Sequence, residues 1–553
     1  MPAMTVADAV IEALVQAGVR RIFGIPGGGS SLDIIEASAK RGIDFVLART
    51  ETSAALMAAA TAEITGIPGV IVTGLGPGAA NATNGIAYAQ LDRAPLLVIA
   101  DRFDDAESYV SHQAVDHGKL FAEVVKGSRV LRSGDGPADV TALLRLALAH
   151  PQGAVHIDLS SKQAGAPAGL RAARTGAAPD AFSEADNVFS EIDNVFSEID
   201  NVFSEIDSGA ARALLAAARK PAILAGLQAR HASEPLRALA AELACPVFTT
   251  FKAKGALPDD DPLCIGLTTG GTAEAPCLGD ADLLILYGFD PVELIPQPWK
   301  YGAPIVELGL VRGLAHYRAP DVSLIGPLAA GAAALRGTNR AGGWNVAELG
   351  AHKANLRARI ARHVMPGALG AVEVVEAAAR AAPQGVRVTV DAGAHMFAVM
   401  SLWRARAVND VIISDGLSTM GLALPAAIGA ALETPERPVM CFTGDGGLMM
   451  CLGELATAAE NGCNIAVVVL NDAALSLIDV KQQKRGLPTR GVRYPRTDFA
   501  LLARGMGCRA FTARDAPELE AAIKAGFAAP GPALIDAHVD PAKYSAQVDA
   551  LRA

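Results

Sequence analysis

The sequence predicts an α/β protein built from three doubly wound domains, each containing a parallel sheet. Short apolar strands alternate with stretches of helical periodicity, which is the pattern of βαβ units. The strands are continuously apolar, so helices are expected to cover both faces of each sheet. The alternation occurs in three separate stretches of the 553-residue chain, a length that suits about three to four domains.

The first stretch runs from Thr5 to about Ser160. Thr5 can cap a helix that ends near Ala17, and further helices are expected at residues 51–65 and 77–91. Strands are expected between and after these helices, at residues 21–26, 45–47, 69–74 and 95–100.

The same alternation returns twice. Strands of the second stretch are expected at residues 221–226, 246–250, 283–288 and 304–309. Strands of the third stretch are expected at residues 386–393, 411–414, 438–447, 465–471 and 533–539. The predicted division is an N-terminal domain, a linker, a middle domain, a second linker and a C-terminal domain, at residues 1–170, 171–207, 208–337, 338–365 and 366–553.

The first linker contains an internal repeat. Residues 182–207 are a heptad, FSEIDNV, copied almost without change. Its apolar residues could form one face of a helix that mediates a contact. The alternative is an extended linker with no role of its own.

The amino-acid composition argues against several classes of protein. The net charge of −10 argues against nucleic acid or an anionic membrane surface as the main partner. Hydrophobic residues make up 51% of the chain, which excludes a mostly disordered protein, yet no apolar run approaches the roughly 20 residues of a membrane helix. The N-terminus carries acids and does not resemble a secretory signal. Seven cysteines without a CxxC pair predict free, buried thiols and a cytoplasmic location.

The strongest chemical signal lies in the third stretch. Gly444, Asp445, Gly446 and Gly447 follow one predicted strand, and Asp472 follows the next. Because parallel strands present their carboxyl ends at one edge, the two acids can supply oxygen ligands to Mg²⁺. The backbone carbonyl of Ala474 could add a third metal ligand. The glycines let the backbone approach a diphosphate, whose oxygens would complete the coordination shell.

At these residues the chain resembles the thiamine-diphosphate-dependent decarboxylases and carboligases, and within them the acetolactate synthase group. The resemblance covers nearly the whole chain, and Asp472 stands where the family usually has an asparagine. The matching segments are GIPGGG (24–29), GPGAANATNGIAYAQLDRAPLLVI (76–99), STMGLALPAAIGA (418–430) and GDGGLMMCLGELATA (444–458).

The resemblance implies a fold and an assembly. The N-terminal domain would bind the aminopyrimidine ring, and the C-terminal domain would bind the diphosphate. Each active site would lie between two subunits of a homodimer or homotetramer. Whether the middle domain binds FAD, a nucleotide or nothing is left open.

The resemblance also assigns roles to residues. Glu51 matches the catalytic glutamate that contacts a pyrimidine nitrogen. Met420 matches the apolar residue wedged between the two cofactor rings, and the Ser418 carbonyl would accept the pyrimidine amino group. The remaining cofactor contacts are expected from Gly393, Ala394, His395, Ala474 and Leu475, in addition to the glycine turn and the two acids.

His112 and Gln113 are expected to face the reactive carbon of the cofactor. Acetolactate synthases have an aromatic residue followed by Gln here, whereas pyruvate decarboxylases have two histidines, so this chain combines both patterns. Lys481 lies near the sequence position at which biosynthetic acetolactate synthases carry a tryptophan. It belongs either to a solvated charged face or to an electropositive lid over an anionic substrate.

The expected function is therefore a Mg²⁺- and thiamine-diphosphate-dependent enzyme that makes or breaks a C–C bond in 2-oxo acids or aldehydes. The function predicted first is that of an acetolactate-synthase-like carboligase. The alternatives are a non-oxidative 2-oxo-acid decarboxylase, an aldehyde or 2-hydroxyacyl-CoA lyase and a flavin-linked oxidase. A catalytically silent regulatory subunit is the alternative from a different class.

Overall fold

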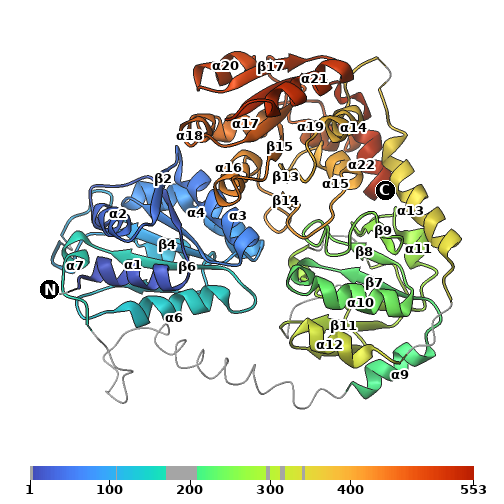
Figure 1. Ribbon diagram of the computed structural model, residues 1–553, viewed down its shortest axis with the longest axis horizontal. Coiled ribbons are helices and arrows are strands. Elements are labelled where there is room, and N and C mark those ends of the chain that lie inside the picture. Colours follow the sequence, from blue (N-terminus) through green and yellow to red (C-terminus); the bar gives the residue numbers. More distant parts are fainter. Residues whose placement is uncertain are drawn as a thin grey trace. The chain divides into compact units, whose positions relative to one another are not determined.

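The computed structural model describes residues 4–107, 109–169, 208–293, 299–311, 318–338, 343–365 and 367–552. Within these residues the chain forms three six-stranded sheets, in which neighbouring strands are parallel (Figure 1). This arrangement confirms the predicted fold class. The heptad repeat lies outside the described residues, so its role stays a prediction.

The first sheet has the strand order β2-β1-β3-β4-β6-β5. Its strands are β1 (Arg21–Gly24), β2 (Asp44–Leu47), β3 (Gly69–Thr73), β4 (Leu96–Asp101), β5 (Ser128–Val130) and β6 (Ala154–Leu159). Its helices are α1 (Val6–Gln16), α2 (Ser30–Lys40), α3 (Glu51–Thr65), α4 (Gly76–Leu91), η1 (Asp105–Glu107), α5 (His117–Phe121), α6 (Pro137–Leu148) and α7 (Ser161–Ala164). Helix α1 packs against α2 and α6, and α3 packs against α4.

The glycine-rich turn between β1 and α2 is held by a carboxylate of the chain itself. Asp101, at the end of β4, is only 1% exposed. Its Oδ1 accepts hydrogen bonds from the Ser31 amide at 2.6 Å and the Ser30 hydroxyl at 2.8 Å, and its Oδ2 accepts one from the Gly29 amide at 3.2 Å. The positive end of α2 therefore faces an internal negative charge.

The second sheet has the order β12-β11-β10-β7-β8-β9. Its strands are β7 (Pro221–Ala225), β8 (Val247–Thr249), β9 (Cys264–Leu267), β10 (Leu283–Tyr287), β11 (Ile305–Gly309) and β12 (Val322–Ile325). Its helices are α9 (Gly209–Ala217), η3 (Leu227–His231), α10 (Ser233–Leu243), α11 (Ala275–Leu278), η4 (Pro291–Glu293) and α12 (Leu328–Leu335). Helix α13 (Val346–Ala361) follows and contacts β9, so a helix fills most of the predicted second linker.

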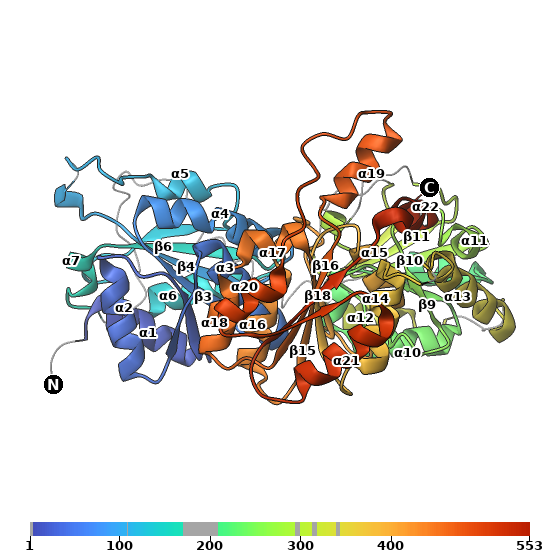
Figure 2. The same ribbon diagram turned by 90° about the horizontal axis from the view of Figure 1, so that it is seen from above.

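The third sheet repeats the topology of the first, with the order β14-β13-β15-β16-β18-β17. Its strands are β13 (Arg387–Val390), β14 (Val411–Ile413), β15 (Val439–Gly444), β16 (Ile465–Asn471), β17 (Arg509–Ala513) and β18 (Ala533–His538). Its helices are α14 (Ala371–Ala381), α15 (Met396–Leu402), α16 (Ala423–Glu433), α17 (Asp445–Cys451), α18 (Glu454–Glu460), α19 (Ser476–Lys484), α20 (Phe499–Gly505), α21 (Ala516–Phe527), η5 (Pro541–Lys543) and α22 (Tyr544–Arg552). Helix α19 contacts α22 (Figure 2).

Contacts divide the chain into two compact units. The first comprises residues 1–200 with 428–434, and the second comprises residues 201–427 with 435–553. The second and third sheets therefore share one unit. The five-part division expected from the sequence stays a prediction.

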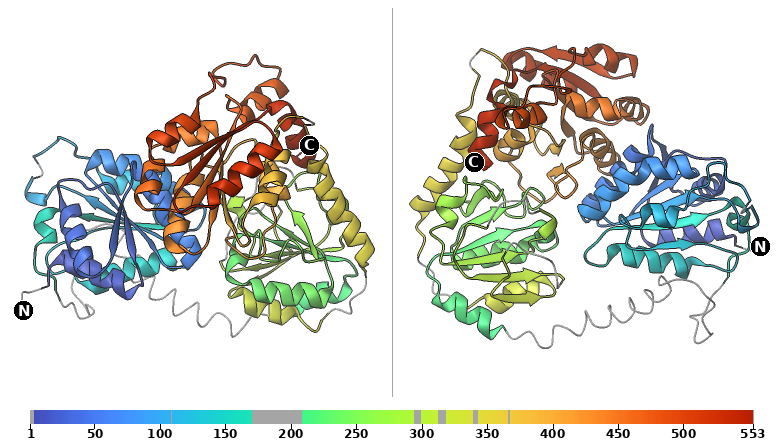
Figure 3. Two further views of the ribbon diagram at one scale, coloured as in Figure 1. Left: turned by 45° about the horizontal axis from the view of Figure 1, so that its top comes forward. Right: turned by 180° about the vertical axis from the view of Figure 1, so that it is seen from behind.

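Apolar strands explain why these sheets form. Every residue of β4 and of β16 is buried, as expected for central strands covered on both faces. The strands of each sheet fan out with the twist typical of parallel sheets (Figure 3). All seven cysteines are buried and free, which confirms the predicted thiol state. Among the described helices, none has both the length and the apolarity needed to cross a bilayer.

Candidate active site

A cavity of about 280 Å³ lies at the carboxyl ends of β13, β15 and β16. The chain runs from β13 to β14 on one side and returns to β15 on the other, so the strand order reverses there. Open α/β sheets bind ligands at such a reversal. The cavity brings together all the cofactor-binding residues predicted in this domain: Gly393, Ala394, His395, Ser418, Met420, Gly444, Asp445, Gly446, Gly447, Asp472, Ala474 and Leu475.

Asp445 is the first residue of α17 and is 3% exposed. Its Oδ1 accepts hydrogen bonds from the Gly446 amide at 2.7 Å and the Tyr494 hydroxyl at 2.9 Å, and its Oδ2 accepts one from the Ala473 amide at 2.7 Å. Burial raises the pKa of Asp445 above its usual range, although these hydrogen bonds oppose the shift. The carboxylate is thus fixed in position.

Asp472 follows β16 and lies beside Asp445. Its Oδ1 accepts a hydrogen bond from the Ala474 amide at 3.0 Å, and its Oδ2 accepts one from the Ser476 hydroxyl at 2.7 Å. Burial, followed by the negative charge of Asp445, raises the pKa of Asp472 to about 7. Two carboxylates that oppose each other's ionisation form a site that a cation would stabilise.

The glycine turn between these acids has no room for side chains. A Cβ atom on Gly446 would lie 2.5 Å from Leu475 Cδ2 and 3.6 Å from Met420 Cε. A Cβ atom on Gly447 would lie 2.2 Å from Asp391 Oδ2. Glycine is therefore required here by the closeness of the neighbouring atoms, and its absence of a side chain leaves backbone amides accessible from the cavity.

His395 precedes α15 and is 4% exposed. Burial lowers the pKa of His395 to about 4, while the Phe442 carbonyl acts in the opposite direction. The imidazole is therefore neutral at pH 7. Its Nε2 atom is buried, with no hydrogen-bond partner among the described residues. A ligand in the cavity can supply that partner.

Ser418 and Met420 lie on the loop between β14 and α16. Ser418 adopts a left-handed backbone conformation, with φ of 52°, and its hydroxyl donates to the Asp415 carbonyl at 3.0 Å. The end of this loop is tied to the sheet by Asp391, which accepts hydrogen bonds from the Ala423 amide at 2.9 Å and the Thr443 hydroxyl at 2.7 Å. Asp391 thereby positions the loop that carries Met420.

Lys481 lines the cavity from α19. The basic run that follows it points elsewhere, since Lys484 pairs with Asp549 and Gln482 bonds the backbone of Arg490. The choice between a solvated face and a lid stays a prediction. Lys481 alone places a positive charge at this cavity among the basic residues of the run.

Glu51 belongs to the first unit, where it begins α3 behind the N-cap residue Thr50. Its Oε2 accepts a hydrogen bond from Asn81 Nδ2 at 2.6 Å. A Cβ atom on Gly78 would lie 3.0 Å from Glu51 Oε1, so the glycine keeps this side chain uncrowded. The carboxyl group is half-buried at the amino end of a helix, where a negative charge is favoured.

His112 and Gln113 also belong to the first unit, on the exposed segment before α5. Gln113 adopts a left-handed conformation with φ of 58°, and its carbonyl accepts a hydrogen bond from the Gly76 amide at 3.2 Å. A Cβ atom on Gly76 would lie 2.5 Å from that carbonyl oxygen. The start of α4 therefore anchors the segment that carries the pair. The predicted roles of Glu51, His112 and Gln113 stay predictions.

Sequence reasoning missed Asp391, Ser476 and Tyr494. Asp391 carries the same signal as Asp445, an acid directly after a strand and before a glycine turn, so the pattern could have found it. Tyr494 lies in an irregular segment after α19, and nothing in its neighbours indicates that its hydroxyl reaches Asp445.

Three family models match the chain in succession. The N-terminal thiamine pyrophosphate binding domain matches residues 4–120, the central domain of the same enzymes matches residues 209–335, and the C-terminal binding domain matches residues 391–537. The last range contains every residue named above as lining the cavity.

Three relatives match over nearly their whole length. The chain is 27% identical to an acetolactate synthase of Bacillus subtilis, covering 97% of this chain and 93% of that protein. It is 29% identical to a catabolic acetolactate synthase of Raoultella terrigena, covering 97% and 95%. It is 31% identical to a probable 2-ketoarginine decarboxylase of Pseudomonas aeruginosa, covering 96% and 94%. With its three matched domains and these full-length relatives, the chain belongs to the thiamine-pyrophosphate-dependent enzymes, as an acetolactate-synthase-like member.

Proposed function

We propose that the chain uses thiamine diphosphate and Mg²⁺ to join a 2-oxo acid, after its decarboxylation, to a second carbonyl compound. The observation that carries this proposal is the pair of carboxylates, buried Asp445 and half-buried Asp472, beside a glycine turn at the strand-order reversal. The acetolactate synthases among its relatives support carboligation as the reaction.

The residues present fit a Mg²⁺ ion. Asp445 and Asp472 would supply carboxylate oxygens, and the carbonyl of Ala474, which also lines the cavity, would supply a third oxygen. Such an all-oxygen set, completed by diphosphate oxygens, is the set that Mg²⁺ prefers. The cation would also relieve the repulsion that raises the pKa of Asp472.

The rest of the cavity fits a diphosphate and the rings attached to it. Gly446 and Gly447 allow close approach of an anion to the backbone at the amino end of α17. The buried Nε2 of His395 has no hydrogen-bond partner among the described residues, so a bound ligand could supply one. Met420 presents an apolar side chain to the cavity, and Leu475 faces it across Gly446.

The chain's own groups would move and hold protons around this cofactor. When bound, thiamine diphosphate supplies a carbon that accepts the electron pair released as CO₂ leaves a 2-oxo acid. Glu51 would hold a proton at a pyrimidine nitrogen, for which Asn81 fixes its carboxylate. His112 would donate a proton near the reacting carbon, and Gln113 would hydrogen-bond an oxygen there.

A second candidate is a simple 2-oxo-acid decarboxylase. Two observations favour it: His112 stands where the synthases carry an aromatic residue, and the relative from Pseudomonas aeruginosa bears the name of a decarboxylase. Lys481 at the cavity suits an anionic substrate in either reaction. The sites are proposed to form between subunits of a cytoplasmic homodimer or homotetramer.

Calorimetry of thiamine diphosphate binding, with and without Mg²⁺, tests the cofactor assignment. The wild-type protein is expected to bind only when Mg²⁺ is present, and Asp445→Ala is expected to lose this Mg²⁺-dependent binding because it removes a charged ligand. If Asp445→Ala binds as tightly as wild type, the metal assignment is wrong. Incubation with a panel of 2-oxo acids and aldehydes, with products identified by mass spectrometry, then separates carboligation from aldehyde release.

A further inference from the structure

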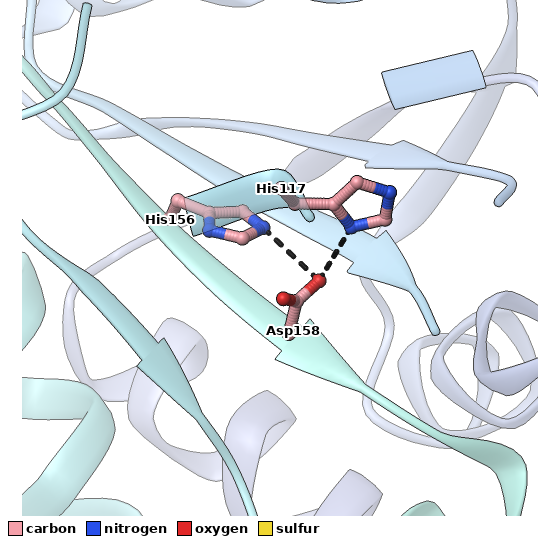
Figure 4. A group of neighbouring side chains, drawn as sticks. All are labelled: His117, His156 and Asp158. Carbon is pink, nitrogen blue, oxygen red and sulfur yellow. Dashed lines mark hydrogen bonds and ion pairs between the residues drawn. The ribbon is translucent and has the colours of Figure 1, made fainter. Parts of the chain in front are cut away.

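Two histidines and an aspartate meet inside the domain of the first sheet (Figure 4). His156 and Asp158 are two positions apart on β6 and therefore point to the same face of the strand. His117 opens α5 and reaches the same point from the helix. The side chains of His117 and His156 are 3% and 1% exposed, so the cluster is almost closed to water.

The distances in this cluster match those between ligands of one metal ion. Asp158 Oδ1 lies 2.7 Å from His117 Nδ1 and 3.3 Å from His156 Nε2. One donor atom from each of the three residues lies within 4.8 Å of the other two. In a tetrahedral zinc site with bonds of about 2.0–2.1 Å, neighbouring donors are about 3.3 Å apart. The three side chains therefore need little movement to bind one ion.

The hydrogen bonds within the cluster do not give every histidine ring nitrogen a partner. His156 Nδ1 lies 3.2 Å from the Ser128 hydroxyl on the adjacent strand β5, with Ser128 directly opposite His156 in the register. His156 Nε2 approaches the carboxylate without hydrogen-bond geometry, and the Nε2 atoms of both histidines lack a hydrogen-bond partner among the described residues. When His156 Nδ1 donates to Ser128, the Nε2 lone pair faces a carboxylate oxygen, and a cation between them would remove the repulsion.

The charge of the cluster also suits a cation. Asp158, whose side chain is 13% exposed, brings a carboxylate against two histidine side chains that are almost fully buried. Two neutral imidazoles and one carboxylate form a donor set of the kind that Zn²⁺ and its first-row neighbours bind, whereas Mg²⁺ prefers oxygen donors alone.

We propose that His117, His156 and Asp158 form a binding site for a divalent transition-metal ion of the zinc type, which shares no residue with the diphosphate cavity. The ion ties the first turn of α5 to β6. Because His117 lies four positions after Gln113, it fixes the end of the exposed segment that carries His112 and Gln113. Metal binding itself does not depend on the proposed function, whereas this anchoring role does.

The exposed group of Asp280, Glu348 and His352 is the other set of potential ligands among the described residues, and it serves as the control. Lys220 Nζ lies 2.6 Å from Glu348 Oε1, which places a positive charge where a cation would have to bind. This group is therefore a poor site, and His352→Ala is expected to leave metal binding unchanged.

The test uses the full chain, freed of metal by a chelator and kept without thiamine diphosphate, with Co²⁺ as the probe. The wild-type protein is expected to bind one equivalent tightly, with the visible absorption bands of a low-symmetry nitrogen- and oxygen-coordinated ion and without the near-ultraviolet bands of thiolate coordination. One equivalent of Zn²⁺ should abolish the bands. Asp158→Asn, whose amide oxygen can still accept from His117, should weaken binding by more than about 100-fold, and Ser128→Ala by about 10–100-fold through loss of its bond to His156.

Three results would overturn the proposal: no stoichiometric binding by wild type, unchanged binding by Asp158→Asn, or loss of binding in His352→Ala. The wild-type titration decides the matter even if a variant fails to fold, and circular dichroism identifies such a variant. Because no activity is measured, failure here leaves the proposed function untouched. The anchoring role is read separately, as slower proteolysis of residues 109–116 in wild type once Zn²⁺ is added.

Discussion

Replacing Asp472 by asparagine should make the cofactor-free protein more stable, although it alters the proposed metal site. The folded-state pKa of Asp472 is about 7, against about 3.9 in an unfolded chain. An acid whose pKa is raised on folding lowers stability progressively as pH rises from about 4 to about 7, and the loss is constant above pH 7. Asparagine has no such titration and can still accept from the Ala474 amide.

The magnitude follows from the shift. Three pKa units correspond to about 4 kcal/mol, and because Asp472 is not completely buried the realised gain should be about 2–4 kcal/mol at pH 8. At pH 5 the gain should fall to about 1 kcal/mol, because most of the wild-type carboxyl group is then protonated. Bound Mg²⁺ and thiamine diphosphate should reduce the stability difference between Asp472→Asn and wild type at pH 8. The reason is that the cation stabilises the ionised carboxylates of Asp445 and Asp472 in the wild-type protein.

Thermal unfolding of the metal- and cofactor-free proteins by differential scanning calorimetry, from pH 5 to pH 8.5, measures this difference. Asp479→Asn is the matched control, because hydrogen bonds from Thr489 and Arg493 outweigh burial and lower the pKa of Asp479. That variant should be less stable than wild type by a similar amount at pH 5 and at pH 8.5, because a pKa lowered on folding changes stability only below the unfolded value of about 3.9. A melting difference for Asp472→Asn that is the same at pH 5 and pH 8.5, or of opposite sign, would refute the reasoning.

Three further outcomes are expected. Glu51→Gln should still bind thiamine diphosphate, but deuterium exchange at C2 of the bound cofactor, followed by NMR, should slow by about 10²–10⁴-fold; unchanged exchange would contradict the role of the carboxyl group. His112→Phe should raise the ratio of carboligation product to free aldehyde, measured by mass spectrometry with the same donor, because it removes a proton donor; an equal ratio would mean that His112 does not face the reacting carbon. Gly446→Ala should weaken cofactor binding in calorimetry by about tenfold or more, since its methyl group would lie 2.5 Å from Leu475 and overpacking costs about 1–3 kcal/mol, whereas wild-type affinity would show that the turn can shift.

The central strands could be predicted because they are apolar on both faces. Four strands were not predicted: β5, β9, β12 and β17. All four are edge strands with at least one residue only half-buried. Such strands have a weaker apolar pattern, and their identity is decided by the strand beside them. The inner strand β6 was also missed, because His156 and Asp158 interrupt its apolar run.

Some residues of the candidate site could likewise be predicted from the sequence, and others could not. Asp445 and Asp472 could be predicted because each directly follows an apolar strand, and adjacent parallel strands end at one edge. Tyr494 could not, since an irregular segment brings it to Asp445. The cluster of His117, His156 and Asp158 could not be predicted either, because it depends on a helix meeting a strand that the pattern did not reveal.

The carboxylate of Asp101 has a consequence for how the first and third sheets differ. Both sheets have the same strand order, and both have a glycine-rich turn at the carboxyl end of a strand, after β1 in the first sheet and after β15 in the third. In the first sheet, a tethered anion already occupies the amides of Gly29 and Ser31, so any phosphate would have to displace it. The two repeats of this topology therefore differ: a carboxylate of the chain already binds amides of the glycine turn in the first sheet, whereas Gly444, Gly446 and Gly447 of the third sheet line a cavity.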